Sequence, residues 1–285
     1  MKNPNMKVEV FKGIEASVNS YIFENGKSTV VMDVLRNSKE AMDLVEVIEK
    51  KGLPLTHILI SHGHPDHYIG MDVVSKAFPE AKIVTASAEI KADILGFSQY
   101  MESIGWLDTE PALKPRTKEN TDGFDYQAKI QVLESDKLEM IGGGTLEINT
   151  AYLSAEAEHL STVFSKDLNA LFTSDFCYNG VHLWLGPGVS KDHVENWKGE
   201  LNKMKEQYGG SNLTIYPGHG DKSTPELFDT VLKYLSDFQS TIATSKSKEE
   251  AINVMKKIYP NWKEDDFLLL YSADHHMRLK EGSAD

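Results

Sequence analysis

Three histidines and one aspartate crowd into the six positions 62–67, within the stretch LISHGHPDHYIG. Imidazole nitrogens and carboxylate oxygens are ordinary ligands of zinc and similar divalent ions. The run HILIS (57–61), directly before these residues, is short and apolar, as a buried strand should be. This placement predicts a metal site, rather than a helix start at which Asp66 acts as the cap and the imidazoles are solvated. The four candidate ligands are His62, His64, Asp66 and His67.

The spacing within this cluster suggests two neighbouring ions. His62 and His64 can converge only if the backbone turns sharply between them, and Gly63 and Pro65 suit such a turn. Asp66 and its neighbour are adjacent, so in regular structure their side chains would point away from each other. We therefore expect the first two histidines to face one ion and the Asp66–His67 pair to face the other.

SHGHPDH resembles the H-x-H-x-D-H signature of the metallo-β-lactamase superfamily. The resemblance, which extends over roughly residues 8–220, implies an α/β fold of the αββα sandwich type. In such a fold two packed mixed sheets are flanked by helices, and the metals lie at one edge of the sheets. Three further ligands should each follow a later strand: His159 in AEAEHLSTVF, Asp175 in ALFTSD and His219 in TIYPGHG.

The resemblance distributes these ligands over two divalent ions. Zinc is the first expectation for both ions, and manganese and iron are the alternatives, because histidine and aspartate accept all three. The family usually has glycines around its third histidine, as in G-H-[ST]-x-G, whereas this chain has EHLST, so the local turn must differ. No cofactor other than metal is expected. One ion is assigned to His62, His64 and His159, the other to Asp66, His67 and His219, and Asp175 bridges them.

Two ions bridged by a carboxylate can also hold a hydroxide between them. Metal binding lowers the pKa of water from 15.7 to about 7, which supplies a nucleophile at neutral pH. Asp66 is placed to orient this hydroxide and to pass a proton to the leaving group, or it acts as a ligand alone. Hydrolysis is therefore the expected reaction.

The substrate is expected to be a carboxylic ester or a lactone. Tyr178 follows Asp175 by three residues, which is similar to the quorum-quenching acyl-homoserine-lactone lactonases. That similarity implies that its hydroxyl contacts the substrate carbonyl, the alternative being a packed aromatic rim. In true class B β-lactamases of this fold no aspartate bridges the ions as Asp175 would, which disfavours that activity. An apolar wall for the substrate is expected from Phe97, Tyr100, Met101, Trp106, Phe176 and Trp184.

Other members of the superfamily define the alternatives. A glyoxalase II-like thioesterase or a phosphodiesterase would use the same seven ligands, as would a sulfatase. The C-terminal helices carry no basic cluster suited to glutathione, which disfavours the thioesterase. An iron-dependent redox enzyme is less favoured, because such relatives use fewer of the ligands or carry a flavin domain.

Composition narrows the class of partner. The 285 residues carry a net charge of −13, which argues against binding nucleic acid or anionic lipid. The only cysteine is Cys177, so there is no intrachain disulfide, and a reducing compartment is expected. The N-terminal residues lack the apolar core of a signal peptide, and no apolar run approaches the ~20 residues of a membrane span. We expect a cytoplasmic enzyme with a small-molecule substrate. The sequence does not decide between a monomer and a homodimer.

The remaining pattern predicts the elements that position these residues. Asn25-Gly26 predicts a hairpin between two strands, and Ser38 is expected to cap the helix that follows. Strands and helices then alternate, as expected of a sheet covered by helices. We expect a single domain over residues 1–285, with an excursion of loops and short helices at 96–140 and a C-terminal helical extension at 225–285.

Overall fold

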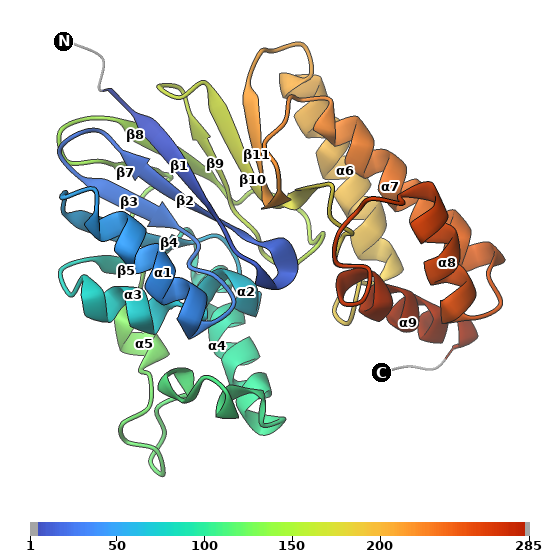
Figure 1. Ribbon diagram of the computed structural model, residues 1–285, viewed down its shortest axis with the longest axis horizontal. Helices are drawn as coiled ribbons and strands as arrows, with labels where there is room; N and C mark the ends of the chain where they lie inside the picture. Colours follow the sequence, from blue (N-terminus) through green and yellow to red (C-terminus); the bar gives the residue numbers. More distant parts are fainter. Residues whose placement is uncertain (1–4, 283–285) are drawn as a thin grey trace. The chain divides into compact units, whose positions relative to one another are not determined.

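The computed structural model describes residues 5–282 (Figure 1). Within this range the chain forms two compact units. Unit 1 comprises residues 5–151 and 159–171, and unit 2 comprises residues 152–158 and 172–282. The expectation of a single domain over the whole chain stays a prediction.

Unit 1 is built around a six-stranded sheet in the order β1-β2-β3-β4-β5-β6. The first three strands are antiparallel, and β3 to β6 are parallel. The hairpin predicted at Asn25-Gly26 is confirmed: it joins β2 to β3, and Gly26 has a φ of +78°. The strands are β1 (Lys7–Lys12), β2 (Asn19–Glu24), β3 (Thr29–Met32), β4 (Leu55–Ile60), β5 (Lys82–Thr85) and β6 (Ile130–Val132).

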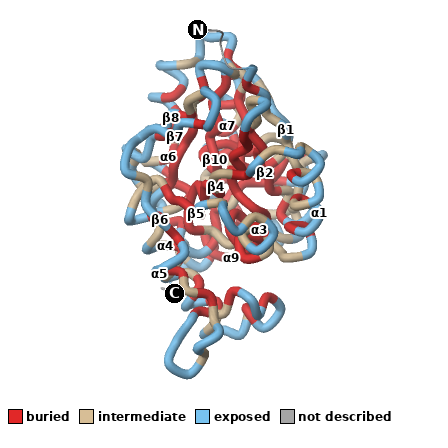
Figure 2. Tube along the Cα trace, turned by 90° about the vertical axis from the view of Figure 1, so that its left-hand side faces the viewer, coloured by how far each residue is buried: buried red, intermediate tan, exposed pale blue. Residues whose placement is uncertain are grey.

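Helices cover this sheet through one apolar cluster. Ile58 of β4 and Ile83 of β5 belong to the same buried cluster as Leu44, Val74 and Ile94 from three helices. Strands β2 to β5 lie largely in the buried interior that Figure 2 shows in red, whereas no residue of β1 is buried. The helices of unit 1 are α1 (Ser38–Glu49), α2 (Pro65–Tyr68), α3 (Met71–Ala77), α4 (Ala88–Ser103) and α5 (Tyr126–Lys129).

The start of α1 differs from the expectation by one position. Asn37, not Ser38, is the N-cap: its backbone is extended, and its side chain accepts a hydrogen bond from the backbone N–H of Glu40. The Ser38 hydroxyl instead donates to Glu110 at 2.5 Å. Ser38 thus lies inside the helix and binds the 96–140 segment.

The excursion expected at 96–140 begins inside a helix, since α4 extends to Ser103. Two short 3₁₀ turns follow, η2 (Trp106–Asp108) and η3 (Pro111–Leu113), before α5 and β6. Leu107, Leu113 and Phe124 are buried in the main cluster of unit 1. The segment therefore contributes to the core as well as to the exposed green loop at the bottom of Figure 1.

The second sheet has five strands, in the order β11-β10-β9-β8-β7. In unit 1, β7 (Lys137–Glu139), β8 (Thr145–Asn149) and β9 (Thr162–Ser165) pair antiparallel. Strand β10 (Ala170–Asn179) begins at the end of unit 1 and continues in unit 2, where its sheet neighbour is β11 (Thr214–Gly220).

Four helices make up the rest of unit 2: α6 (Lys191–Tyr208), α7 (Leu227–Thr244), α8 (Lys248–Ile258) and α9 (Leu268–Glu281). The helical spacing of Val194, Trp197, Leu201 and Met204 predicts that these residues share one inward face of α6, and all four are buried. The Trp197 indole N–H donates to the backbone carbonyl of Phe176, which ties α6 to β10.

The C-terminal helices are part of the compact body of unit 2. The inward residues Leu227, Val231, Leu235 and Phe238 of α7 are all buried, as their helical spacing predicts. Helix α9 lies within the helical extension expected at 225–285, although it was not predicted as a separate helix. No helix among residues 5–282 is long and apolar enough to cross a membrane.

Candidate metal centre

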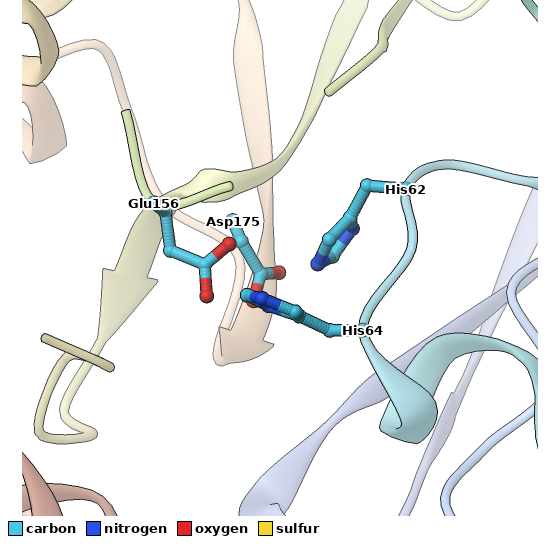
Figure 3. A group of neighbouring side chains, drawn as sticks. All are labelled: His62, His64, Glu156 and Asp175. Carbon is cyan, nitrogen blue, oxygen red and sulfur yellow. The ribbon is translucent and has the colours of Figure 1, made fainter. Parts of the chain in front are cut away.

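The loop after β4 turns sharply between its two histidines because Gly63 packs directly against α4. A Cβ atom on Gly63 would lie 2.7 Å from the Cβ of Asp93, closer than real side chains come. Pro65 then occupies the first turn of α2. The ring centroids of His62 and His64 lie 4.9 Å apart, and Figure 3 shows both rings directed to the same side of the loop. Their ligand atoms lie within 4.8 Å of each other, as the predicted turn requires.

Asp33, directly after β3, holds this loop in place. Its side chain is buried, and its φ of +60° is one that aspartate tolerates better than most residues. Its Oδ1 accepts a hydrogen bond from the Ser61 backbone N–H at 2.8 Å, and its Oδ2 accepts one from the Ser61 hydroxyl at 2.8 Å. The same Oδ2 lies 2.8 Å from His67 Nδ1.

These contacts determine which ring nitrogen of His62 and of His67 carries the proton. His67 must donate its Nδ1–H to the Asp33 carboxylate, so Nε2 carries the lone pair. The Ser61 hydroxyl donates its single proton to Asp33. His62 must therefore donate its Nδ1–H to the Ser61 oxygen, which lies 3.0 Å away. Both histidines are therefore prepared to bind a metal through Nε2, and their ring centroids lie 4.2 Å apart.

Asp66 and His67 are also brought together in unit 1. Asp66 Oδ2 lies 3.8 Å from His67 Nε2, and both residues are largely buried. Two ligand atoms at this separation can share one ion, so the adjacency of these residues in α2 does not make them diverge.

His159 lies near this loop but faces elsewhere. Its chain neighbours Leu160 and Ser161 bridge to the loop, through the β-bridge His62↔Leu160 and a 3.0 Å hydrogen bond from Ser161 N to the Ser61 carbonyl. The His159 side chain is 46% exposed, and its Nδ1 lies 2.9 Å from Asp93 Oδ2. Among residues 5–282, it is the one predicted histidine ligand that joins no cluster of candidate ligand atoms.

In unit 2, Asp175 and His219 lie side by side on β10 and β11. His219 Nε2 is 3.1 Å from Asp175 Oδ2, and both side chains are almost fully buried. Gly218 makes this approach possible, because a Cβ atom there would lie 1.8 Å from Asp175 Oδ1. Ser174, just before Asp175, has a φ of +47°, so the strand is irregular where it presents the carboxylate.

Tyr178 binds this pair through both its ring and its hydroxyl. The hydroxyl donates to Asp175 Oδ2 at 2.5 Å, and the ring stacks on His219 with centroids 4.4 Å apart and parallel planes. Tyr178 is 1% exposed. Its hydroxyl is thus engaged with a carboxylate rather than exposed to solvent.

Glu156 is a site residue that the sequence reasoning missed. It is 1% exposed, and its Oε1 lies 3.3 Å from the Tyr178 hydroxyl. One of its carboxylate oxygens lies within 4.8 Å of one from Asp175. Figure 3 shows the two side chains next to each other. Glu156 precedes His159 in AEAEHL, where a search for a third histidine passes over it.

The six residues expected to form an apolar wall have different surroundings. Phe97 lies beside the loop that follows β4, since its ring centroid is 5.9 Å from that of His64. The ring of Tyr100 lies 5.9 Å from that of Phe97. Met101 and Phe176 are core residues. Trp106 lies under the guanidinium of Arg36, and Trp184 packs near Phe267 and Tyr271.

His182, which lies close after Asp175 in sequence, belongs to an aromatic cluster in unit 2. Its Nδ1 lies 2.8 Å from the Tyr234 hydroxyl, and its ring lies near Trp262. Burial lowers the pKa of His182 to about 4, so it is neutral at pH 7.

Comparisons with known proteins agree with this arrangement of motifs. A family model described as the metallo-beta-lactamase superfamily matches residues 13–219. A metallo-beta-lactamase type 2 from Bacillus sp. (strain 170) is 26% identical over 214 residues, which cover 74% of this chain and 69% of that protein.

Solved structures show the same fold. A metallo-beta-lactamase family protein from Thermus thermophilus has a TM-score of 0.66 and 14% identity, over 98% of this chain and 94% of that one. A stereoselective inverting sec-alkylsulfatase from Pseudomonas sp. has a TM-score of 0.65 and 15% identity, over 98% of this chain and 49% of that one. The predicted fold, two mixed sheets flanked by helices, is confirmed.

Proposed function

Because this chain belongs to the metallo-β-lactamase superfamily, we propose that it is a binuclear metal-dependent hydrolase that cleaves a carboxylic ester or a lactone. Membership and the clustered histidines and aspartates support metal-dependent hydrolysis. The observation that carries the proposal is the contact of His67 Nδ1 with Asp33 and of His62 Nδ1 with Ser61. These contacts present Nε2 of His62 and of His67 as unprotonated nitrogens, as metal ligation requires.

The donor set fits two divalent ions. Imidazole nitrogens with carboxylate oxygens suit zinc first, and also manganese and iron. Buried carboxylates need a compensating charge, and a divalent ion supplies it. We propose that His62, His64 and His159 bind one ion, that Asp66, His67 and His219 bind the other, and that Asp175 binds both.

The bound ions would supply a hydroxide at neutral pH and polarise the substrate carbonyl. The protein's own residues would orient the ligands and handle the proton. Asp33 fixes the ring of His67. We propose that Asp66, which is 8% exposed, holds or passes a proton. To donate to the oxyanion, the Tyr178 hydroxyl must exchange its bond to Asp175 for one to the substrate, which limits the gain.

The choice of an ester or lactone rests on the surroundings of His64. Phe97 lies edge-to-face with the ring of His64 and with Tyr100 on its own helix. Tyr100 is 56% exposed, so an acyl group would meet aromatic surface. The similar proteins include a metallo-beta-lactamase and a sec-alkylsulfatase, so a β-lactam and an alkyl sulfate belong among the substrates to be tested.

A substrate panel on protein of known metal content tests the proposal. The panel comprises lactones, aryl esters, thioesters, phosphodiesters, a β-lactam and a secondary alkyl sulfate. We expect about two zinc-like ions per chain and the highest kcat/KM on a lactone or carboxylic ester. A single iron per chain without hydrolysis would point to redox chemistry, and preference for another class would overturn the substrate assignment.

A further inference from the structure

The loop 152–158 places Glu156 in the interior of unit 2 by several contacts with α6. The backbone N–H of Leu153 donates to Glu200, Ser154 lies 3.4 Å from Asn196, and Glu158 pairs with His193 at 3.1 Å. The loop is thus bound to one helix at residues on both sides of Glu156. Glu158 is exposed, whereas Glu156 is 1% exposed. The carboxylate of Glu156 is therefore buried by a fixed loop.

This carboxylate shares its environment with a second one. The Tyr178 hydroxyl lies 2.5 Å from Asp175 Oδ2 and 3.3 Å from Glu156 Oε1. One hydroxyl has one proton, so it cannot donate to both carboxylates at once. Two buried carboxylates with oxygens within 4.8 Å of each other repel, and a cation between them would offset that repulsion. This arrangement is what a shared metal ion requires.

The histidine that the family pattern selects is arranged differently. His159 is half-exposed, and the Asp93 carboxylate on α4 holds its Nδ1. The chain also lacks the glycines that usually surround the third histidine of the family, so the backbone here follows another path.

We infer that Glu156 is a ligand of the ion bound by Asp175, and that it takes the place assigned to His159. The inference rests on the proposed metal centre and changes its chemistry. A carboxylate in place of a neutral imidazole adds one negative charge to the ligand set. It also shifts the preference of the site toward metals that favour oxygen ligands, such as manganese.

Metal affinity of the whole protein tests this inference without relying on activity. The variants are Glu156→Gln, which keeps the size and removes the charge, and His159→Asn as the matched control. Metal per chain is measured after dialysis, and dissociation constants are measured by competition with a chromophoric chelator. Loss of a residue that only supports a ligand costs about 10- to 100-fold in affinity, so loss of a ligand should cost about 100-fold or more. We expect that loss for one ion in Glu156→Gln and less than about threefold change in His159→Asn.

Two further variants separate ligation from a structural role. Tyr178→Phe removes the hydroxyl between the carboxylates and should keep both ions, because both ligand oxygens remain. Glu156→His should restore much of the affinity, and in the cobalt-substituted protein it should shift the visible absorption bands, since nitrogen replaces oxygen. If Glu156 were only structural, Glu156→Gln would lower the melting temperature of the metal-free protein; we expect no decrease.

The outcomes distinguish this inference from the proposed function. Wild-type protein that binds no divalent ion would overturn both. Wild-type protein with two ions, Glu156→Gln with unchanged affinities and His159→Asn with one ion lost would overturn the role of Glu156 alone.

Discussion

The Asp33 carboxylate is the sharpest place to test how the protein prepares its ligands. In Asp33→Asn the amide keeps one acceptor oxygen, whereas the native carboxylate accepts from Ser61 N, Ser61 Oγ and His67 Nδ1, each at 2.8 Å. If the oxygen stays with the backbone N–H, the NH₂ group faces two donors. His67 can relieve that conflict only by moving its proton to Nε2, the atom that must bind the metal.

The magnitude follows from this change of tautomer. Losing an outer partner of a metal-binding histidine costs about 10- to 100-fold in metal affinity, or about 1.4 to 2.8 kcal/mol. We expect Asp33→Asn to lower the affinity for the ion bound by His67 by that factor. Chelator competition measures the affinity of each ion, and turnover of the best substrate should fall with occupancy at limiting metal.

Ser61→Ala is the control for the ion bound by His67. It removes the hydrogen bond to Asp33 and the contact with His62 Nδ1, but it leaves the bond between Asp33 and His67 Nδ1 intact. Its effect on the ion bound by His67 should be several-fold smaller. Equal affinities in wild type and Asp33→Asn would refute the argument that this carboxylate sets the tautomer.

Four other changes test separate parts of the molecule. Asp175→Asn removes the charge proposed to compensate two cations, so metal content should fall toward one ion per chain and hydrolysis by orders of magnitude; two retained ions with normal turnover would contradict the bridging role. Tyr178→Phe should lower turnover on esters and lactones roughly tenfold with little change in metal content, and unchanged turnover on every substrate would leave the tyrosine as packing. Truncation at Ser223 should give insoluble or unfolded protein, because the buried face of α7 is lost; a soluble, metal-loaded product would contradict this. Burial lowers the pKa of His182 to about 4, so its contribution to stability is present above its unfolded pKa and is lost as pH falls toward 4. The loss should be about 2 kcal/mol from pH 7.5 to 5, and urea unfolding of His182→Gln should show a weaker pH dependence than wild type.

Local patterns in the sequence predict much of the fold. The Asn25-Gly26 hairpin and the inward face of α6 depend on neighbours in sequence, and the structure has both. Helix α9 was not predicted as a separate helix because the apolar run at its start, Phe267–Tyr271, is followed by SADHH, which interrupts a simple amphipathic pattern. His275 and His276 are nevertheless buried there.

The residues that support the site are harder to predict, because they act across long sequence separations. Asp33 contacts His67, 34 positions away, and in the sequence VVMDV it resembles the end of a strand. Glu156 meets Tyr178 across 22 positions, and its position in AEAE resembles a solvated loop. Such contacts can be predicted only when the pairing and register of the strands are known.

The attachment of the loop 152–158 to α6 bears on how the site could be transplanted or redesigned. His193, Asn196 and Glu200 contact the loop at intervals of three and four residues, so successive turns of one helix face it. A graft of the loop alone into another scaffold would lack these contacts and leave Glu156 free to move. Loop and helix therefore form one module, and variants selected for altered metal preference should include changes on α6 that never touch the ion.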